Sequence, residues 1–225
     1  EAGATESTQE LITRNLVPML KATVTTTLPL TAISFVIGLA IALAVALARI
    51  SSIRLLSLLA RFYVSIVRGT PLLLQLFIVF YALPQFGVVI SPFPAAVGAF
   101  SINVGGYAAE IVRAAILGVP KGQWEAAETI GMGYRTTLQR IVLPQALRTA
   151  VPPLSNTLIS LVKDTSLAST ILVTELLRVA QLAAAPTFDF FALYSVAAVY
   201  YWIICIVLSS VQGRLETRLD RYVAR

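Results

Sequence analysis

Six polar side chains lie within otherwise apolar stretches of the sequence. They are Asn103, Glu110, Asn156, Ser160, Lys163 and Asp164. Ionisable groups in such surroundings are costly unless they pair or face water, so they are candidates for contact with a polar solute. A structural role stays open, because Glu110 could pair with Arg113 at i+3 and polar groups also mark ordinary helix packing in membranes.

Several kinds of catalytic and nucleotide-binding site are excluded by residues that the sequence lacks. It contains no histidine, which removes Ser-His and Cys-His catalysis, and it has no Gly-x-Ser-x-Gly segment. None of its three lysines follows a glycine, so the Gly-Lys pair of an ATP-binding loop is absent. We therefore expect no enzyme activity and no ATP, cofactor or metal bound by this chain itself.

The elements that must position these side chains are predicted from long apolar stretches. Of the 225 residues, 57% are hydrophobic and 12% are charged, whereas a soluble domain has about 25% charged residues. A bilayer requires about 20 apolar residues in a helix. The sequence predicts one all-α membrane domain over 1–225, with five spans at about 22–48, 57–83, 92–112, 150–172 and 190–212. The second span could instead begin near Thr70. The amphipathic segment before the first span is expected to lie on the membrane surface or to extend the helix of the first span.

The distribution of basic residues predicts the orientation of these spans. Thirteen Lys and Arg residues lie in loops and span ends on one side, and three lie on the other, namely Arg14, Lys21 and Arg178. Because cytoplasmic loops carry the excess of Lys and Arg, the N-terminus is expected outside and the C-terminus in the cytoplasm. The same clusters account for the net charge of +6, so we expect contact with lipid and none with nucleic acid.

A long polar loop at about 118–148 separates the third and fourth predicted spans. Its composition predicts two short helices, near 124–130 and 134–143, with Gly131 at the break because glycine adopts positive φ at little cost. The second helix is expected to stop near Pro144. Glu125 is expected in the first turn of the first helix, where an acid opposes the positive end of the helix dipole.

The spacing of seven residues in this loop is E-A-A-x3-G-x9-I-x-L-P. They are Glu125, Ala126, Ala127, Gly131, Ile141, Leu143 and Pro144. This pattern resembles the cytoplasmic loop of bacterial ABC-type importer permeases at every defined position. The resemblance implies that these residues couple the permease to a separate ATPase, with the helix that contains Glu125 seated in an ATPase groove.

Two further segments resemble the polar amino acid branch of these permeases, namely Arg68-Gly69-Thr70-Pro71-Leu72 and Lys163-Asp164-Thr165-Ser166-Leu167. Within that branch the overall likeness is to L-cystine permeases, through segments such as Leu83-Pro84-Gln85-Phe86-Gly87 and Tyr201-Trp202-Ile203. Importers for arginine, glutamine or histidine are the alternatives. A carboxylate such as Glu110 or Asp164 would suit the ammonium group of an amino acid, and Lys163 its carboxylate.

The resemblance also implies an assembly and a location. The expected partners are a second permease subunit, preferably an identical one, two ATPase subunits that bind ATP and Mg, and an extracytoplasmic solute-binding protein. Alternating access in the bacterial inner membrane is the implied mechanism. A secondary carrier or channel is a remote alternative, since such carriers usually show internal repeats with interrupted helices, and neither is evident in the sequence.

Overall fold

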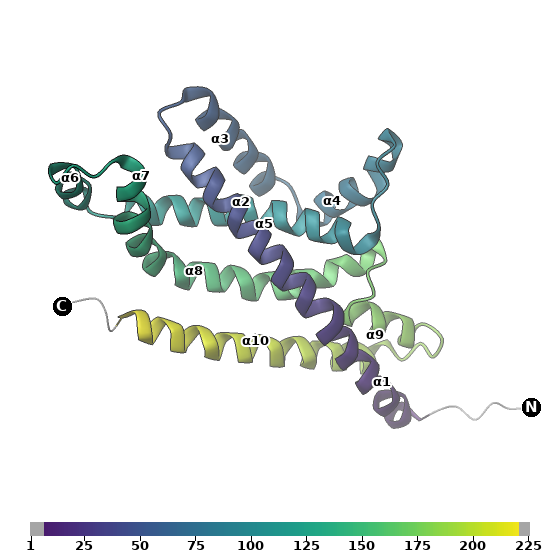
Figure 1. Cartoon of the computed structure of the whole chain (residues 1–225). Coiled ribbons are helices and arrows are strands. Elements are labelled where there is room, and N and C mark those ends of the chain that lie inside the picture. The colour runs from purple at the N-terminus through teal and green to yellow at the C-terminus, as the bar shows by residue number, and fades with distance from the viewer. Residues whose placement is uncertain (1–6, 221–225) are drawn as a thin grey trace, which may run out of the picture. The chain divides into compact units, whose positions relative to one another are not determined.

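The computed structural model describes residues 7–220, which form helices joined by short turns without a β-strand (Figure 1). The α-helices are α1 (Thr8–Ala22), α2 (Leu28–Ile50), α3 (Arg54–Gly69), α4 (Leu72–Phe77), α5 (Pro92–Leu117), α6 (Lys121–Thr129), α7 (Tyr134–Thr137), α8 (Leu143–Asp164), α9 (Leu176–Ala184) and α10 (Phe190–Asp220). Short π-helical turns occupy Thr23–Thr27, Ile78–Ala82 and Leu138–Val142, and 3₁₀ turns occupy Leu83–Phe86 and Thr165–Ile171. The all-α prediction is confirmed.

Three helical runs are long and apolar enough to cross a membrane: Thr8–Ile50, Pro92–Leu117 and Phe190–Leu219. Two interrupted helix pairs raise the number to as many as five if each pair forms one span. The pairs are Arg54–Gly69 with Leu72–Phe86, and Tyr134–Ile171 with Leu176–Ala184. The number of predicted spans, five, equals the largest number of spans that the structure allows. Their orientation stays a prediction.

The helices contribute to two compact units. The first contains the described residues through Ser34, Leu73–Ala99 and Ile159–Ser210. The second contains Phe35–Leu72, Phe100–Leu158 and the described residues from Val211 onward. The long helices α2, α5, α8 and α10 each supply residues to both units.

In the first unit, the amphipathic helix α1 packs against α9 and α10. Ser7 caps α1 in a capping box with Glu10, which satisfies backbone N–H groups at the helix start. The buried side chain of Leu11 packs with Ala184 and Leu193, and that of Met19 packs with Leu176. Since α1 runs without a break through Thr23–Thr27 into α2, the segment before the first predicted span extends that helix.

In the second unit, glycines allow α5 to approach α2 and α3 closely. A Cβ atom added at Gly105 would lie 2.5 Å from Ile41 Cγ2, and one added at Gly106 would lie 2.5 Å from Val67 Cγ1. Tyr63 Oη donates a hydrogen bond of 2.6 Å to the carbonyl of Ile102. The space beside these glycines is thus filled by packed side chains, as small residues permit in membrane helix pairs.

Each π-helical turn is followed by a Leu-Pro pair. These pairs are Leu28-Pro29, Leu83-Pro84 and Leu143-Pro144, and each leucine N–H bonds the carbonyl five residues earlier. Proline has no N–H, and its ring clashes with the carbonyl four residues before it in a regular α-helix. The wider π turn accommodates the ring, so the helical path continues past the proline. The expected helix end near Pro144 is therefore wrong, because α8 begins at Leu143 and runs to Asp164.

Both helix pairs are interrupted. The first break lies at Thr70, near the alternative start of the second span, whereas the break after Ile171 was not anticipated from the sequence. Thr70 adopts an extended conformation between α3 and α4, which the following Pro71 favours. The 3₁₀ turn Thr165–Ile171 ends at Leu172, whose φ is 70°. A leucine in this left-handed conformation costs about 1–2 kcal/mol. Interrupted helices therefore do not distinguish this chain from a secondary carrier.

The close approach at Gly106 predicts the effect of adding a methyl group there. Gly106→Ala should destabilise the purified chain by about 1–3 kcal/mol, because its Cβ would overlap the Val67 side chain. The matched control is Gly98→Ala in the same helix, where no atom other than those of the adjacent residues and the nearby backbone of the helix lies within 4 Å of the added Cβ. Thermal unfolding in detergent measures both variants. Equal unfolding temperatures for the two would contradict the packing described here.

Candidate functional site

Gly131 ends the first helix of the long loop in a left-handed conformation. Its φ is 76°, as expected from its position at the break. The N–H of Met132 bonds the carbonyl of Ala127 at 3.0 Å, and the N–H of Gly131 bonds that of Glu128 at 2.9 Å. This pair of bonds is a Schellman motif, which satisfies the last carbonyls of α6 and requires positive φ at the glycine. The loop geometry at this point is therefore set by a residue that tolerates positive φ.

The three residues of the Glu-Ala-Ala segment do not share one environment on α6. Ala127 is 1% exposed, whereas Glu125 and Ala126 are exposed. Helix α6 begins at Lys121, so Glu125 is its fifth residue, and no acidic residue lies in the first turn. The expected interaction of Glu125 with the helix dipole is therefore wrong, because Gly122 is accommodated within the helix and does not precede it. Glu125 and Ala126 remain accessible to a partner protein.

Side-chain contacts brace α6 against the following segment. The rings of Trp124 and Tyr134 stack with centroids 5.7 Å apart and an interplanar angle of 21°. Gln145 Nε2, in the first turn of α8, donates a hydrogen bond of 3.3 Å to Gln123 Oε1. These contacts join α6 to both α7 and α8.

The remaining residues of the spacing pattern lie where the loop enters α8. Ile141 belongs to the π-helical turn and is half-buried, Leu143 is half-buried at the start of α8, and Pro144 is exposed. Because α7, this turn and α8 follow each other without a break, Tyr134–Asp164 is one helical path. The loop is thus joined directly to the helix that carries Asn156, Ser160, Lys163 and Asp164.

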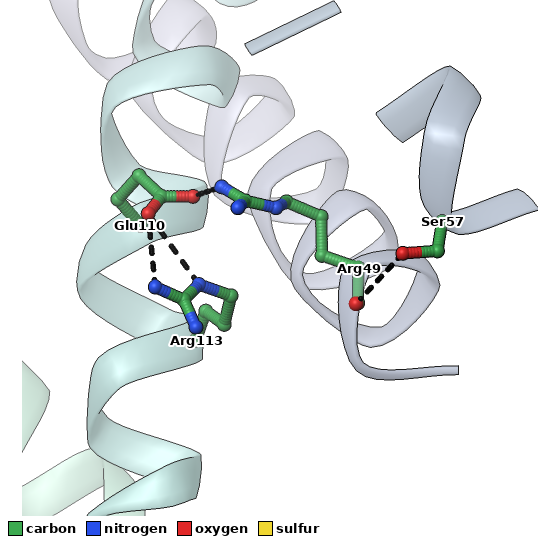
Figure 2. Close-up of polar contacts among 4 residues, drawn as sticks. All are labelled: Arg49, Ser57, Glu110 and Arg113. Carbon is green, nitrogen blue, oxygen red and sulfur yellow. Dashed lines mark hydrogen bonds and ion pairs between the residues drawn. The ribbon is translucent and has the colours of Figure 1, made fainter. Parts of the chain in front are cut away.

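Glu110 lies in an ion cluster formed by α2 and α5, which a hydrogen bond connects to α3 (Figure 2). Its carboxylate forms ion pairs with Arg49 at the end of α2 and with Arg113 Nη2, the latter at 3.3 Å. The backbone carbonyl of Arg49 accepts a hydrogen bond of 3.1 Å from Ser57 Oγ of α3. The structure therefore shows the pairing of Glu110 with Arg113 that the sequence analysis left open, and adds Arg49 as a second partner.

Polar residues also form a face along α8. Asn156, Ser160 and Lys163 follow each other at i, i+4 and i+7, which places them on one side of the helix, and all three are exposed. Gln212 Nε2 of α10 donates a hydrogen bond of 3.2 Å to Asn156 Oδ1. Asp164 is half-buried, as is Asn103 on α5. The described bond of Asn156 thus joins α8 to α10, and contact of any of these residues with a solute stays a prediction.

Glu175 is a buried carboxylate that sequence reasoning missed. It is 0% exposed and precedes α9, where its oxygens accept hydrogen bonds from the N–H of Leu177 at 2.9 Å and of Arg178 at 2.7 Å. Tyr201 Oη of α10 donates a third bond of 2.6 Å. Glutamate is not among the preferred N-cap residues. The sequence signal that could have identified Glu175 was a single acidic residue directly before the amphipathic segment that forms α9. Glu175 joins the start of α9 to α10.

Comparison with known proteins finds a family model and several full-length relatives. The model of the family described as binding-protein-dependent transport system inner membrane component matches residues 40–221. The L-cystine transport system permease protein TcyB of Bacillus subtilis is 56% identical over 96% of this chain and 93% of its own length. The probable amino-acid ABC transporter permease protein YckA of the same organism is 42% identical over 88% and 87%.

A solved structure has the same architecture. A chain from the crystal structure of an amino acid ABC transporter with histidines superposes with a TM-score of 0.79. The two sequences are 34% identical, and the match covers 93% of this chain and 94% of that one. The resemblance stated from the sequence is therefore confirmed by both sequence and fold.

The position of Glu175 predicts a large cost for removing its carboxylate. Glu175→Ala should lower the stability of the purified chain by about 2–4 kcal/mol, because it leaves two backbone N–H groups and a tyrosine hydroxyl without their acceptor. Tyr201→Phe, which removes one of the three donors, should cost about 1–2 kcal/mol. Glu128→Ala on the exposed side of α6 is the control. If Glu175→Ala and Glu128→Ala unfolded at the same temperature, the carboxylate of Glu175 would not hold α9 to α10.

Proposed function

We propose that this chain, which belongs to the family of inner membrane components of binding-protein-dependent transport systems, takes up L-cystine. The chain is a permease subunit of an ABC importer for amino acids. The observation that supports cystine is the 56% identity to a cystine permease along almost the whole chain. Arginine, glutamine and histidine are the alternative substrates, and all of them fit the same importer type.

The proposed driving force is ATP hydrolysis on two separate ATPase subunits, which bind ATP and Mg. The proposed docking surface is the exposed side of α6 with Glu125 and Ala126, together with Ile130 directly after the helix, which is 74% exposed. Closure of the ATPase pair would displace α6. The stacking of Trp124 on Tyr134 and the continuous path from Tyr134 to Asp164 support transmission of that displacement to the polar face of α8.

The polar face of α8 supports a pathway shared with a second permease subunit. Exposed Asn156, Ser160 and Lys163 would be costly in contact with lipid tails, so they need water or a protein partner. An identical second copy would supply the matching face. In this proposal Lys163 attracts the carboxylate of the solute and Asp164 its ammonium group. The ion pairs of Glu110 with Arg49 and Arg113 favour a structural role for that carboxylate.

An extracytoplasmic solute-binding protein delivers the solute in the proposed cycle, and the chain alternates between outward and inward access. The several apolar helices are consistent with a multi-pass membrane protein, and the family places such proteins in the bacterial inner membrane. The excess of Lys and Arg predicts a cytoplasmic position for the loop that carries α6.

Gly131 provides a direct test of the coupling role. Gly131→Arg should weaken ATPase association or reduce transport per ATP hydrolysed, because arginine at a φ of 76° strains the Schellman motif by about 1–2 kcal/mol and displaces α6. The measurement is uptake and ATP hydrolysis by the complex in vesicles with its binding protein.

Gly133→Arg is the matched control for Gly131→Arg. It adds the same charge and bulk two residues away, but Gly133 has a φ of −69°, which arginine adopts without strain. The control should retain ATPase association and coupling. A Gly131→Arg complex that purifies whole and transports normally per ATP hydrolysed would show that this loop is not the coupler.

The substrate and the polar face are tested together by uptake of labelled L-cystine. Wild-type complexes should take up cystine, and excess unlabelled arginine, glutamine or histidine should compete weakly. Asp164→Asn should reduce uptake at least about tenfold while ATPase association is retained, because it removes the charge that faces the ammonium group. Asp189→Asn, outside α8, is the control.

Preferential uptake of arginine, glutamine or histidine would assign the chain to that substrate and leave the importer function intact. Normal cystine uptake by Asp164→Asn would show that Asp164 has only a structural role.

A further inference from the structure

Three arginines form a row along α3. Arg54, Arg61 and Arg68 are seven residues apart, which is close to two helical turns, so they project from the same side of the helix. All three are exposed. In the described part of the chain, Arg61 has no ion pair or hydrogen bond, and Arg68 lies over the ring of Tyr107 at 5.6 Å from its centroid.

Further positive charge gathers at this row. Arg49 at the end of α2 lies beside α3, because its backbone carbonyl accepts a hydrogen bond of 3.1 Å from Ser57 Oγ, and Arg113 shares the carboxylate of Glu110 with Arg49. The carboxylate that forms described ion pairs with this set is Glu110, which contacts Arg49 and Arg113. Two arginines therefore share one carboxylate, and Arg61 and Arg68 form no ion pair with a carboxylate among residues 7–220.

Large apolar side chains border the arginine row on one side. Leu55 is 68% exposed, Phe62 is 66% exposed and Leu58 is 51% exposed. The buried residues Ser57, Ala60, Val64 and Val67 lie on the other side and hold α3 in the unit. The row thus runs along the border between the packed face of α3 and an exposed apolar face, with cationic and apolar groups side by side.

We propose that this side of α3 binds an anionic phospholipid, with the phosphodiester at Arg61 and the acyl chains along Leu58 and Phe62. Guanidinium groups pair well with phosphate oxygens, and exposed apolar side chains suit acyl chains. A small inorganic anion would leave the apolar face uncovered. A zwitterionic amino acid would bring an ammonium group that the arginines repel. The combination of unpaired cations and apolar surface therefore fits a lipid headgroup with its chains.

The test compares two lipids with identical acyl chains. The full-length chain in neutral detergent is titrated with dioctanoyl phosphatidylglycerol or dioctanoyl phosphatidylcholine, and binding is followed by the shift in thermal unfolding and by native mass spectrometry. Each arginine near a membrane surface contributes roughly fivefold to the affinity for an anionic lipid. Arg61→Gln should therefore reduce phosphatidylglycerol affinity about fivefold and leave phosphatidylcholine affinity unchanged. Raised salt should weaken the wild-type preference.

Arg218→Gln in the last turn of α10 is the control, since it removes an exposed arginine outside the row. Equal losses for Arg61→Gln and Arg218→Gln would mean that the lipid responds only to overall charge, which would overturn the site. Equal wild-type affinity for the two lipids would also overturn it. Competition by millimolar inorganic phosphate would identify a general anion site, and competition by free L-cystine a solute site; either result rejects a lipid site.

Discussion

Within a membrane, the backbone polar groups of a fold must find their hydrogen-bond partners inside the protein, and a buried carboxylate is costly without such partners. Glu175 shows how strongly this constraint shapes the first unit. Its fully buried carboxylate accepts hydrogen bonds from the first turn of α9 and from Tyr201 of α10. The adjacent N–H of Leu176 donates to Thr27 Oγ1 in the helical run that contains α1. Three segments distant in the sequence therefore meet at one short stretch of backbone.

The same constraint explains how the long helices tolerate proline. A proline leaves a carbonyl without its usual donor, and its ring occupies space that an α turn does not provide. In three places the chain inserts a π-helical turn before a Leu-Pro pair, so that the neighbouring backbone groups remain bonded. At Leu143-Pro144 this arrangement has a structural consequence, because it lets the loop and α8 form one helical path. A helix end at that proline would have separated the loop from the polar face of α8.

In the second unit, ion pairing and close packing act together. Glycines bring α5 against α2 and α3, and Glu110 then reaches Arg49 and Arg113 (Figure 2). Glu110 pairs with Arg49 and Arg113, whereas Arg61 and Arg68 form no described ion pair. The unit thus combines a packed interior with a cationic border, which is the basis for the proposed lipid site. Its loop presents α6 in a position that Gly131, Trp124 and Gln123 define.

The sequence alone determined the all-α membrane class, the family and the break at Gly131, because these depend on composition, local spacing and a single φ preference. It did not reveal Glu175 as a junction, the partner of Glu110 on α2, or the burial of Ala127 beside exposed Ala126, since each depends on which helices pack together. It also misjudged Pro144 and the start of α6. Whether a proline or a glycine ends a helix depends on the backbone hydrogen bonds of the turns beside it. These hydrogen bonds are known only from the folded backbone.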